Sequence, residues 1–302
     1  MSGILISGLV NTETTVPVHR FPVEYYPIDY PFFGVNTAAS GVAYNIAAAL
    51  GTLGDPVTLL SMTGDDFAGR YIREELADRG IGTDGLRPQL RQTPASVVLY
   101  DPQGKRQVYC DLKDIQEAVY DFSGVPLEAA TLVVACNTNF NRPLLRRARE
   151  LGKTVATDVH VLRDIHDEYN RDFMAGADIL FLSDEGIGED YEDFLRELAR
   201  TYGNRIVVLG RGRKGAALYQ QAKDSVTEMP AVELGPVVNT VGAGDALFSG
   251  FLHYYVRGMA PEECLWRAQI FAAAKIRESG AAKGLITEEV LERYAEELRR
   301  NG

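Results

Sequence analysis

The sequence predicts an α/β fold in which helices cover both faces of a mostly parallel central sheet. The first observation is alternation, because short β-branched runs and helical patterns follow one another through most of the 302 residues, as in parallel sheets. The second is length, since α/β chains of this size often form one large core with an appendage. The third is a break in the alternation at residues 14–39 and about 95–110, which predicts a small additional β-sheet.

Six short apolar runs predict the buried strands of the central sheet. They are Ile4–Val10, Val57–Met62, Leu132–Ala135, Thr154–Thr157, Ile179–Leu182 and Ile206–Leu209. A further β-type run, Pro236–Val241, leads into a glycine turn. Ligands of such sheets bind beyond the carboxyl ends of the strands, so we expect the chemistry there.

Seven segments show helical patterns. They are Val42–Leu53, Phe67–Arg79, Arg142–Leu151, Tyr191–Tyr202, Ala246–Arg257, Pro261–Glu278 and Glu288–Arg299. Asp66 is expected to cap the second of these helices. No internal repeat or linker divides the chain, so we treat residues 1–302 as one domain.

The small sheet is expected to have four strands and to lie over the strand ends as a lid. Its first segment is rich in Tyr, Phe and Pro, and its second flanks the turn Asp101–Gly104. About half of the aromatic residues in the first segment are expected to fill a core beneath this sheet. The others would form a dimer interface or a ligand cover. The aromatic residues concerned include Tyr25, Tyr26, Tyr30, Phe32 and Phe33.

Charge and composition exclude several classes of partner. A net charge of −11 argues against nucleic acid and anionic membranes, and no apolar run approaches the roughly 20 residues of a membrane span. The start Met1–Ile6 predicts a first strand and not a signal peptide. Cys110, Cys136 and Cys264 lack the spacing of a zinc or redox motif and are expected to be reduced and largely buried. These features indicate a cytoplasmic protein.

The stretch VNTVGAGDALFSG, residues 238–250, predicts a phosphate site. Its glycines let the backbone approach a ligand, and a helix start offers free N–H groups to anions. Gly242, Ala243 and Gly244 would form this anion hole. Asp245, in the first helical turn, would accept the proton of a hydroxyl group that attacks a phosphoryl group. A bare Gly-x-Gly-Asp is explained at least as well by an Asp that only complements the helix dipole.

The thirteen-residue stretch as a whole resembles the C-terminal signature of the ribokinase-like (PfkB) carbohydrate kinases. Further stretches in the family's order extend the resemblance from about residue 4 to residue 285. It implies a ribokinase-like fold, ATP as phosphoryl donor, Mg²⁺ bridging the ATP phosphates, and Asp245 as the catalytic base. The acceptor implied is a small molecule, a sugar or a nucleoside.

The resemblance places the acceptor on residues near the first strand and the first helix. The residues implied are Asn11, Glu13, Gly41, Asn45 and, after the run Leu132–Ala135, Asn137. Many relatives have Asp where Glu13 stands and Gly where Ser40 stands. Taken on its own, Asn45 is equally well explained as a capping or packing residue. Asn137, and Asp158 after the next strand, are equally well explained as loop or cap residues.

The resemblance also implies contacts to the nucleotide from a basic glycine-rich loop and from small residues near the C-terminus. The residues implied are Gly210, Arg211, Gly212, Gly215, Thr240 and Ala273. Such a loop supplies the positive charge that an acidic protein needs to hold ATP. A solvated hairpin turn would also explain Arg213 and Lys214, but it explains the glycine spacing less well.

Metal binding is where this chain departs from its relatives. Many of them carry Asn-x-x-Glu where this chain has Ser183 and Gly186. Either Asp184 or Glu185 would take over, directly or through water, since Mg²⁺ usually keeps several waters. We assign Glu185. Asn239 replaces the Asp that often begins the signature, near a monovalent-cation site of relatives, so a requirement for K⁺ stays open.

We therefore expect an ATP-dependent kinase that phosphorylates a primary hydroxyl group of a sugar. The first alternative is a nucleoside kinase of the same family, in which Tyr44 or a lid aromatic stacks on the base. The second is a sugar sensor without catalytic activity. A homodimer through the lid is the assembly that the sequence suggests.

Overall fold

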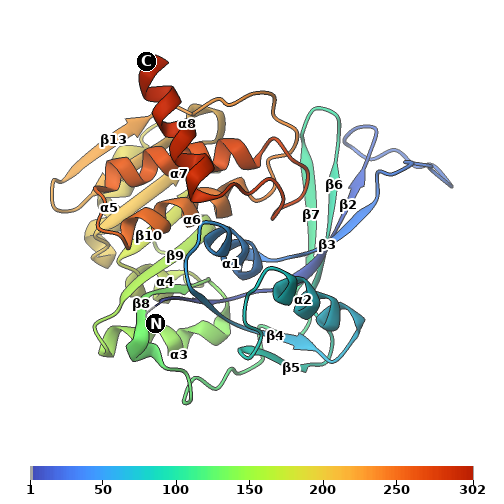
Figure 1. Cartoon of the computed structure of the whole chain (residues 1–302), viewed down its shortest axis with the longest axis horizontal. Helices are drawn as coiled ribbons and strands as arrows, with labels where there is room; N and C mark the ends of the chain where they lie inside the picture. The colour runs from blue at the N-terminus through green and yellow to red at the C-terminus, as the bar shows by residue number, and fades with distance from the viewer. Residues whose placement is uncertain (1–2, 302) are drawn as a thin grey trace.

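The computed structural model describes residues 3–301, and they form a nine-stranded central sheet (Figure 1). Seven strands are parallel, in the order β11-β10-β9-β8-β1-β4-β5, and β12 and β13 extend the β11 edge in antiparallel pairing. The strands are β1 (Gly3–Ser7), β4 (Val57–Gly64), β5 (Leu86–Leu90), β8 (Ala130–Ala135), β9 (Thr154–Val161), β10 (Ile179–Ser183), β11 (Ile206–Gly210), β12 (Ala216–Gln220) and β13 (Ser225–Met229). Met1 and Ser2, at the start of the predicted first strand, lie outside the described residues.

Helices pack on both faces of this sheet, so the predicted fold class is confirmed. The helices are α1 (Val42–Thr52), α2 (Phe67–Asp78), α3 (Arg142–Glu150), α4 (Arg171–Gly176), α5 (Tyr191–Tyr202), α6 (Ala243–Tyr255), α7 (Pro261–Lys275) and α8 (Glu288–Asn301). Side chains of α1, α2, α6, α7 and α8 form one core, and side chains of α3, α4 and α5 form the other. Successive residues of β1 alternate between them: Ile4 and Ile6 enter the first core and Leu5 enters the second, as the two faces of a strand require.

A second, four-stranded sheet projects from one side of these layers (Figure 1). Its order is β3-β2-β6-β7, with β2 (Asn11–Pro17), β3 (Asn36–Ser40), β6 (Ala95–Tyr100) and β7 (Arg106–Asp111). The predicted four strands are therefore present, although β2 begins three residues before the predicted segment. The small sheet follows β1 after a short turn, so the end of β1 and the start of β2 lie close to each other.

The predicted strand Pro236–Val241 is wrong, because this segment has no regular secondary structure. The backbone N–H groups of Val238 and Asn239 both donate to the carbonyl of Ile276, just after α7, at 2.9 and 3.1 Å. The β-branched residues of this segment are thus held by a helix end and not by a neighbouring strand. The edge of the sheet is occupied by β13, which was not predicted.

The burial expected for the aromatic segment is also wrong. The five aromatic side chains named above are exposed, from 50% for Tyr26 to 100% for Phe33. Residues 18–35 form neither helix nor strand and extend beyond the small sheet (Figure 1), so no layer lies beneath them. Cys110, expected to be buried, is exposed because the whole of β7 is solvent-accessible. No helix in the described part of the chain is long and apolar enough to cross a membrane.

Candidate active site

The amino ends of α1 and α6 meet beyond the carboxyl ends of the parallel strands. Each helix is preceded by a glycine with positive φ, 100° at Gly41 and 78° at Gly242. A Cβ atom would lie 2.6 Å from the Leu9 carbonyl oxygen at Gly41, and 2.4 Å from the Ala281 carbonyl oxygen at Gly242. No residue with a side chain fits these two turns without rearrangement. Two helix dipoles therefore present positive ends to one region, which favours an anion there.

A side-chain hydrogen bond joins the two helix starts. Asn45 Nδ2, in the first turn of α1, donates to Asp245 Oδ2, in the first turn of α6, at 2.7 Å. The Asp245 main-chain carbonyl accepts from Ser249 Oγ at 2.7 Å, which fixes the turn that carries the carboxylate. The structure thus brings together two of the residues predicted from distant parts of the sequence.

The environment of Asp245 makes it a stronger base than an ordinary aspartate. Burial raises the pKa of Asp245, and the negative charge of Asp158 raises it further. The hydrogen bond from Asn45 and the charges of His160 and Lys275 oppose this rise in pKa. A carboxylate with a raised pKa accepts a proton more readily, provided that it is ionised at the working pH.

Glu13 is a second carboxylate in the same neighbourhood. It lies on β2, where its Oε2 accepts a long hydrogen bond, 3.5 Å, from Ser40 Oγ. Burial raises the pKa of Glu13, and the charge of Asp245 adds to the rise. Lys275 and Arg106 lower that pKa by their positive charges. The charge of Asp245, the predicted base, therefore acts on Glu13, which is predicted to bind the acceptor.

The glycine turn before α6 offers fewer free donors than its sequence indicates. The Ala243 N–H donates to the Thr240 carbonyl within the turn, at 3.1 Å. The N–H groups of Gly242 and Gly244 make no backbone hydrogen bond within residues 3–301. Gly244 is exposed, and a Cβ atom there would meet nothing within 4 Å. The open side of the turn therefore carries two unengaged amides.

Two buried amide oxygens near these carboxylates lack a donor among the described residues. They are Oδ1 of Asn11 and Oδ1 of Asn45. Asn11 Nδ2 donates to Ser96 Oγ of β6 at 3.1 Å, which leaves the acceptor end of this amide unsatisfied. Buried acceptors without partners are rare in folded proteins, so both oxygens fit a ligand that brings hydroxyl groups.

The structure commits Asn137 and Tyr44 to other contacts. Asn137 Nδ2 donates to Asn170 Oδ1 at 3.1 Å, and the Asn137 carbonyl accepts from the Tyr169 hydroxyl at 2.8 Å. Tyr44 is 1% exposed, and its hydroxyl accepts from Arg79 Nε at 3.1 Å. Because its ring is enclosed in the core, the predicted stacking of Tyr44 on a nucleobase is wrong.

The glycine-rich loop that is predicted to bind the nucleotide forms a hairpin between β11 and β12. Arg211 Nη1 donates to Glu228 Oε1 at 2.8 Å, and its guanidinium lies 4.2 Å from the ring centroid of Tyr191. Arg213 and Lys214 are exposed at the turn and supply positive charge at the surface. Among the other predicted residues, Gly210 ends β11 and Gly212 and Gly215 flank the turn, while Thr240 is exposed and Ala273 is buried in α7.

A magnesium site made by protein alone is not present among residues 3–301, which contain no group of three or more His, Cys, Asp or Glu side chains able to hold a metal. Glu185 is exposed in the loop after β10, and its N–H donates to Ser183 Oγ at 3.3 Å. Mg²⁺ is commonly held by one or two carboxylates together with substrate phosphates. The loop therefore fits a metal that arrives with the nucleotide.

Three basic residues of this site were not predicted as functional. His160, at the end of β9, has a φ of 60°, and its Nδ1 lies 3.6 Å from Asp158 Oδ2. Arg106 comes from β7 of the small sheet, and Lys275 is the last residue of α7. Of the three, only Lys275 could have been recognised from the sequence, because a lysine within an apolar helical run is unusual. The other two are brought in by tertiary structure.

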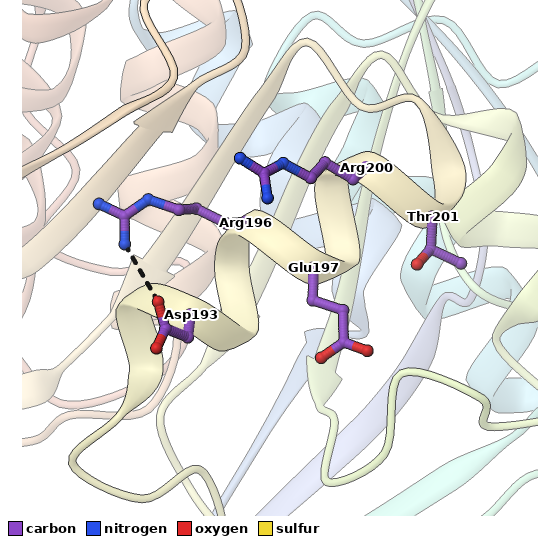
Figure 2. Close-up of a pocket in the computed structure, with 5 residues that line it drawn as sticks. All are labelled: Asp193, Arg196, Glu197, Arg200 and Thr201. Carbon is purple, nitrogen blue, oxygen red and sulfur yellow. Dashed lines mark hydrogen bonds and ion pairs between the residues drawn. The ribbon is translucent and has the colours of Figure 1, made fainter.

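A surface hollow lies along α5, apart from this site. Figure 2 shows its five lining side chains, all from that one helix: Asp193, Arg196, Glu197, Arg200 and Thr201. Arg196 is engaged by Asp193 at 3.4 Å and by Glu192 at 2.9 Å. Ion pairs of this kind between neighbouring helix turns are ordinary surface features, so we assign no chemistry to the hollow.

Comparison with protein families gives one match that spans most of the chain. The model described as "pfkB family carbohydrate kinase" matches residues 4–288. An ATP-dependent ribose-1-phosphate kinase from Halopiger xanaduensis is 27% identical over 286 residues, covering 93% of this chain and 94% of that protein. An acarbose 7(IV)-phosphotransferase from Actinoplanes sp. is 27% identical over 266 residues, covering 87% and 88%. A nucleoside kinase from Methanothermobacter thermautotrophicus is 26% identical over 250 residues, covering 80% and 79%.

Solved structures share the fold at lower identity. A microbiome-derived acarbose kinase superposes with a TM-score of 0.87 at 23% identity, covering 97% of this chain and 99% of that one. Ribokinase of Arabidopsis thaliana, complexed with ribose and ATP, superposes with a TM-score of 0.80 at 22% identity, covering 97% and 98%. Both likenesses show that the overall fold is shared.

Proposed function

Because the chain belongs to the pfkB family of carbohydrate kinases, we propose that it transfers the γ-phosphate of ATP to a primary hydroxyl group of a sugar. The enzyme class follows from the family, whereas the acceptor and the residue roles are our proposal. The observation that carries them is the hydrogen bond between Asn45 and Asp245. It holds a carboxylate with a raised pKa between two helix amino ends.

Asp245 acts as the general base. It takes the proton of the acceptor hydroxyl as the oxygen attacks the γ-phosphorus, and the bond from that phosphorus to the β-γ bridging oxygen breaks. The N–H groups of Gly242 and Gly244 stabilise charge on the transferring phosphoryl group, which is the main work of a phosphotransferase site. Mg²⁺, when bound with ATP, neutralises phosphate charge, and Glu185 is the residue that we assign to it.

The acceptor is held by groups that need hydroxyl donors. The Oδ1 atoms of Asn11 and Asn45 are buried acceptors that find no donor within residues 3–301, and Glu13 adds a carboxylate with one weak hydrogen bond. These groups can accept hydrogen bonds from the ring hydroxyls of a sugar. An apolar acceptor would leave them without hydrogen-bond donors. The small sheet, which carries Asn11 and Glu13, would cover the bound sugar and exclude water that hydrolyses ATP.

A nucleoside is the second candidate acceptor. It is favoured by the similarity to proteins named nucleoside kinase and cytidine kinase. Since Tyr44 is buried, base stacking would have to come from an aromatic residue of the small sheet or of residues 18–35. The relatives reported above are named as kinases or as a phosphotransferase, which gives no support to a non-catalytic sensor. The cytoplasmic location stays a prediction.

A coupled assay of ATP consumption tests the proposal directly. The panel should contain pentoses, hexoses and nucleosides, each beside the analogue that lacks its primary hydroxyl group. We expect turnover with at least one sugar and none with its 5- or 6-deoxy analogue. A preference for nucleosides over every free sugar would establish the second candidate. Phosphorylation of the deoxy analogues would show that the primary hydroxyl is not the acceptor.

A further inference from the structure

Lys275 is a buried lysine that the mechanism above does not use. It ends α7 after three alanines, and it is 0% exposed. Its Nζ donates to the main-chain carbonyl of Val241. Taking an ammonium group out of water is costly unless strong partners replace the water, so the surroundings of Lys275 must supply them.

The carbonyl that Lys275 binds belongs to the peptide group that bears the Gly242 N–H. A trans peptide is planar, and its C=O and N–H point in opposite directions. By holding the Val241 oxygen, Lys275 therefore fixes the direction in which the Gly242 N–H points, away from α7. The Ala281 backbone also lies so close to Gly242 that no Cβ fits there. The hydrogen bond from Lys275 and the close packing of the Ala281 backbone together restrict the conformation of this turn.

The ammonium group also faces the charges of the site. Asp245 on α6 and Glu13 on β2 attract it, and Arg106 on β7 repels it. Burial lowers the pKa of Lys275 to about 8, and the two carboxylates limit the fall. Lys275 therefore carries its charge at neutral pH and loses it slightly above.

We propose that Lys275 is a positioning residue for phosphoryl transfer, which orients the Gly242 N–H toward the transferring phosphate and supplies the positive charge opposite Asp245 and Glu13. The inference rests on the proposed function and deepens it. An ammonium group on the carbonyl polarises the peptide, which makes its N–H a stronger donor to an anion. The same positive charge keeps the two carboxylates ionised where the phosphates of ATP would otherwise raise their pKa.

Lys275→Met tests the role, because methionine keeps the length of the side chain and removes its charge. We expect kcat to fall on the order of 100-fold, as when one donor to a developing oxyanion is lost, with KM for the acceptor changed less than about threefold. The matched control is Lys223→Met, at an exposed lysine in the turn between β12 and β13, which should change neither constant. A kcat for Lys275→Met within about threefold of wild type would overturn the inference.

The pH dependence separates a charged role from packing. Wild-type kcat should fall as pH rises through about 8, where Lys275 loses its proton, and this fall should be absent from Lys275→Met. Lys275→Gln keeps a donor for the Val241 oxygen without the charge. Its kcat at neutral pH should lie between those of wild type and Lys275→Met, and it should not fall above about pH 8. If Lys275→Met proves unfolded by circular dichroism, Lys275→Gln alone decides the question. An unchanged fall in kcat above pH 8 in the folded variant would refute the charge role.

Nucleotide binding without turnover distinguishes this inference from the proposed function. Calorimetric titration with Mg²⁺-ATP, without acceptor, should show wild-type affinity falling between about pH 7 and pH 9.5 and no such change in Lys275→Met. If wild type phosphorylates no acceptor but shows this difference, the proposed acceptor class fails and the inference stands. If wild type is an active kinase and both proteins bind ATP with the same pH dependence, the inference fails alone.

Discussion

Asp245 and Glu13 place two carboxylates, from α6 and β2, in one electrostatic neighbourhood. Each has its pKa raised mainly by burial, and Asp245 raises the pKa of Glu13 as well. Lys275 opposes both shifts in pKa. In our proposal Asp245 acts as the base and Glu13 accepts hydrogen bonds from the acceptor, so two carboxylates would have different roles in one site.

Asp245→Asn should abolish turnover and leave nucleotide affinity nearly unchanged. The substitution keeps the shape and removes the base, whose contribution is typically ~10²–10⁴-fold in rate. Steady-state kinetics with the best acceptor, together with calorimetric titration of ATP, measures both quantities. A variant that keeps more than about a tenth of the wild-type rate would contradict the assignment of Asp245 as base.

Glu13→Gln should stabilise the unliganded protein near neutral pH and weaken acceptor binding. The folded-state pKa of Glu13 is raised above its ordinary value of 4.5, so Glu13 favours the folded state at low pH. This contribution is lost as pH rises from 4.5 through the folded-state pKa. Differential scanning calorimetry should therefore show a gain in Tm over wild type at about pH 7 and little at about pH 4.

The control for this measurement is Glu297→Gln, at an exposed position of α8, which should leave Tm unchanged at both pH values. An equal gain at both pH values for Glu13→Gln would mean that packing, and not charge, explains its effect.

At this scale the sequence predicted Asp245, Asn45 and Glu13 because their neighbours form recognisable local stretches. It could not predict His160 or Arg106, whose relation to Asp245 and Glu13 arises from the ends of β9 and β7. Nor could it show that the Ala243 N–H is used by Thr240, since a turn hydrogen bond depends on backbone angles.

The elements that define the site are two helices whose first turns touch. α1 and α6 each begin at a glycine that a larger residue cannot replace without moving a backbone carbonyl. The sequence predicted both helices because apolar runs follow Gly-rich turns. The strand predicted at Pro236–Val241 is wrong because β-branched composition does not show which acceptors the backbone N–H groups bind. Here the acceptor is the carbonyl of Ile276.

Gly242→Ala should destabilise the protein and reduce activity together. The left-handed backbone at Gly242 costs an L-residue on the order of 1–3 kcal/mol, and the new methyl group would approach the Ala281 oxygen. Urea denaturation followed by circular dichroism measures the first effect, and kcat measures the second. Gly188→Ala is the control, because Gly188 has no positive φ and open space around its Cβ position. Equal stability of the two variants would refute the steric argument.

Glu185, the residue that we assign to Mg²⁺, lies in the loop between β10 and α5. Glu185→Gln should raise the Mg²⁺ concentration needed for half-maximal rate more than Asp184→Asn does, because Glu185 is the residue that we assign to the metal. A titration of MgCl₂ at fixed ATP concentration gives the comparison. Equal and negligible effects would mean that phosphates and water alone hold the ion.

Across the whole molecule, the central sheet and the small sheet have different relations to solvent. Burial on both faces of the central sheet was predictable, since its strands are short continuous apolar runs. The exposure of Tyr25, Phe32 and Phe33 could not be predicted. Sequence alone does not distinguish an aromatic residue in a core from one on a binding surface. β2 carries Glu13 at one end and leads into residues 18–35 at the other.

A second copy of the chain is the partner that we predict for the exposed apolar side chains of residues 18–35 and the outer strand β7. Val108 and Tyr109 of β7 are 53% and 56% exposed, and Phe33 is fully exposed. A stable interface buries roughly 1,200–2,000 Å² in total, and aromatic side chains are typical of its centre. Sedimentation-velocity centrifugation at micromolar concentration should therefore show a dimer.

The double variant Tyr25→Ser/Phe33→Ser should shift that dimer toward monomer, while Phe67→Ser should not. Phe67 is a fair control because it is 79% exposed but begins α2, which is not part of the proposed dimer surface. A wild-type protein that sediments as a monomer would contradict the prediction. So would a double variant that dimerises as tightly as wild type. Because Glu13 and Asn11 lie on β2, which leads directly into residues 18–35 and belongs to the same sheet as β7, loss of the dimer should also raise KM for the acceptor. An unchanged KM in a monomeric variant would show that the acceptor site is complete within one chain.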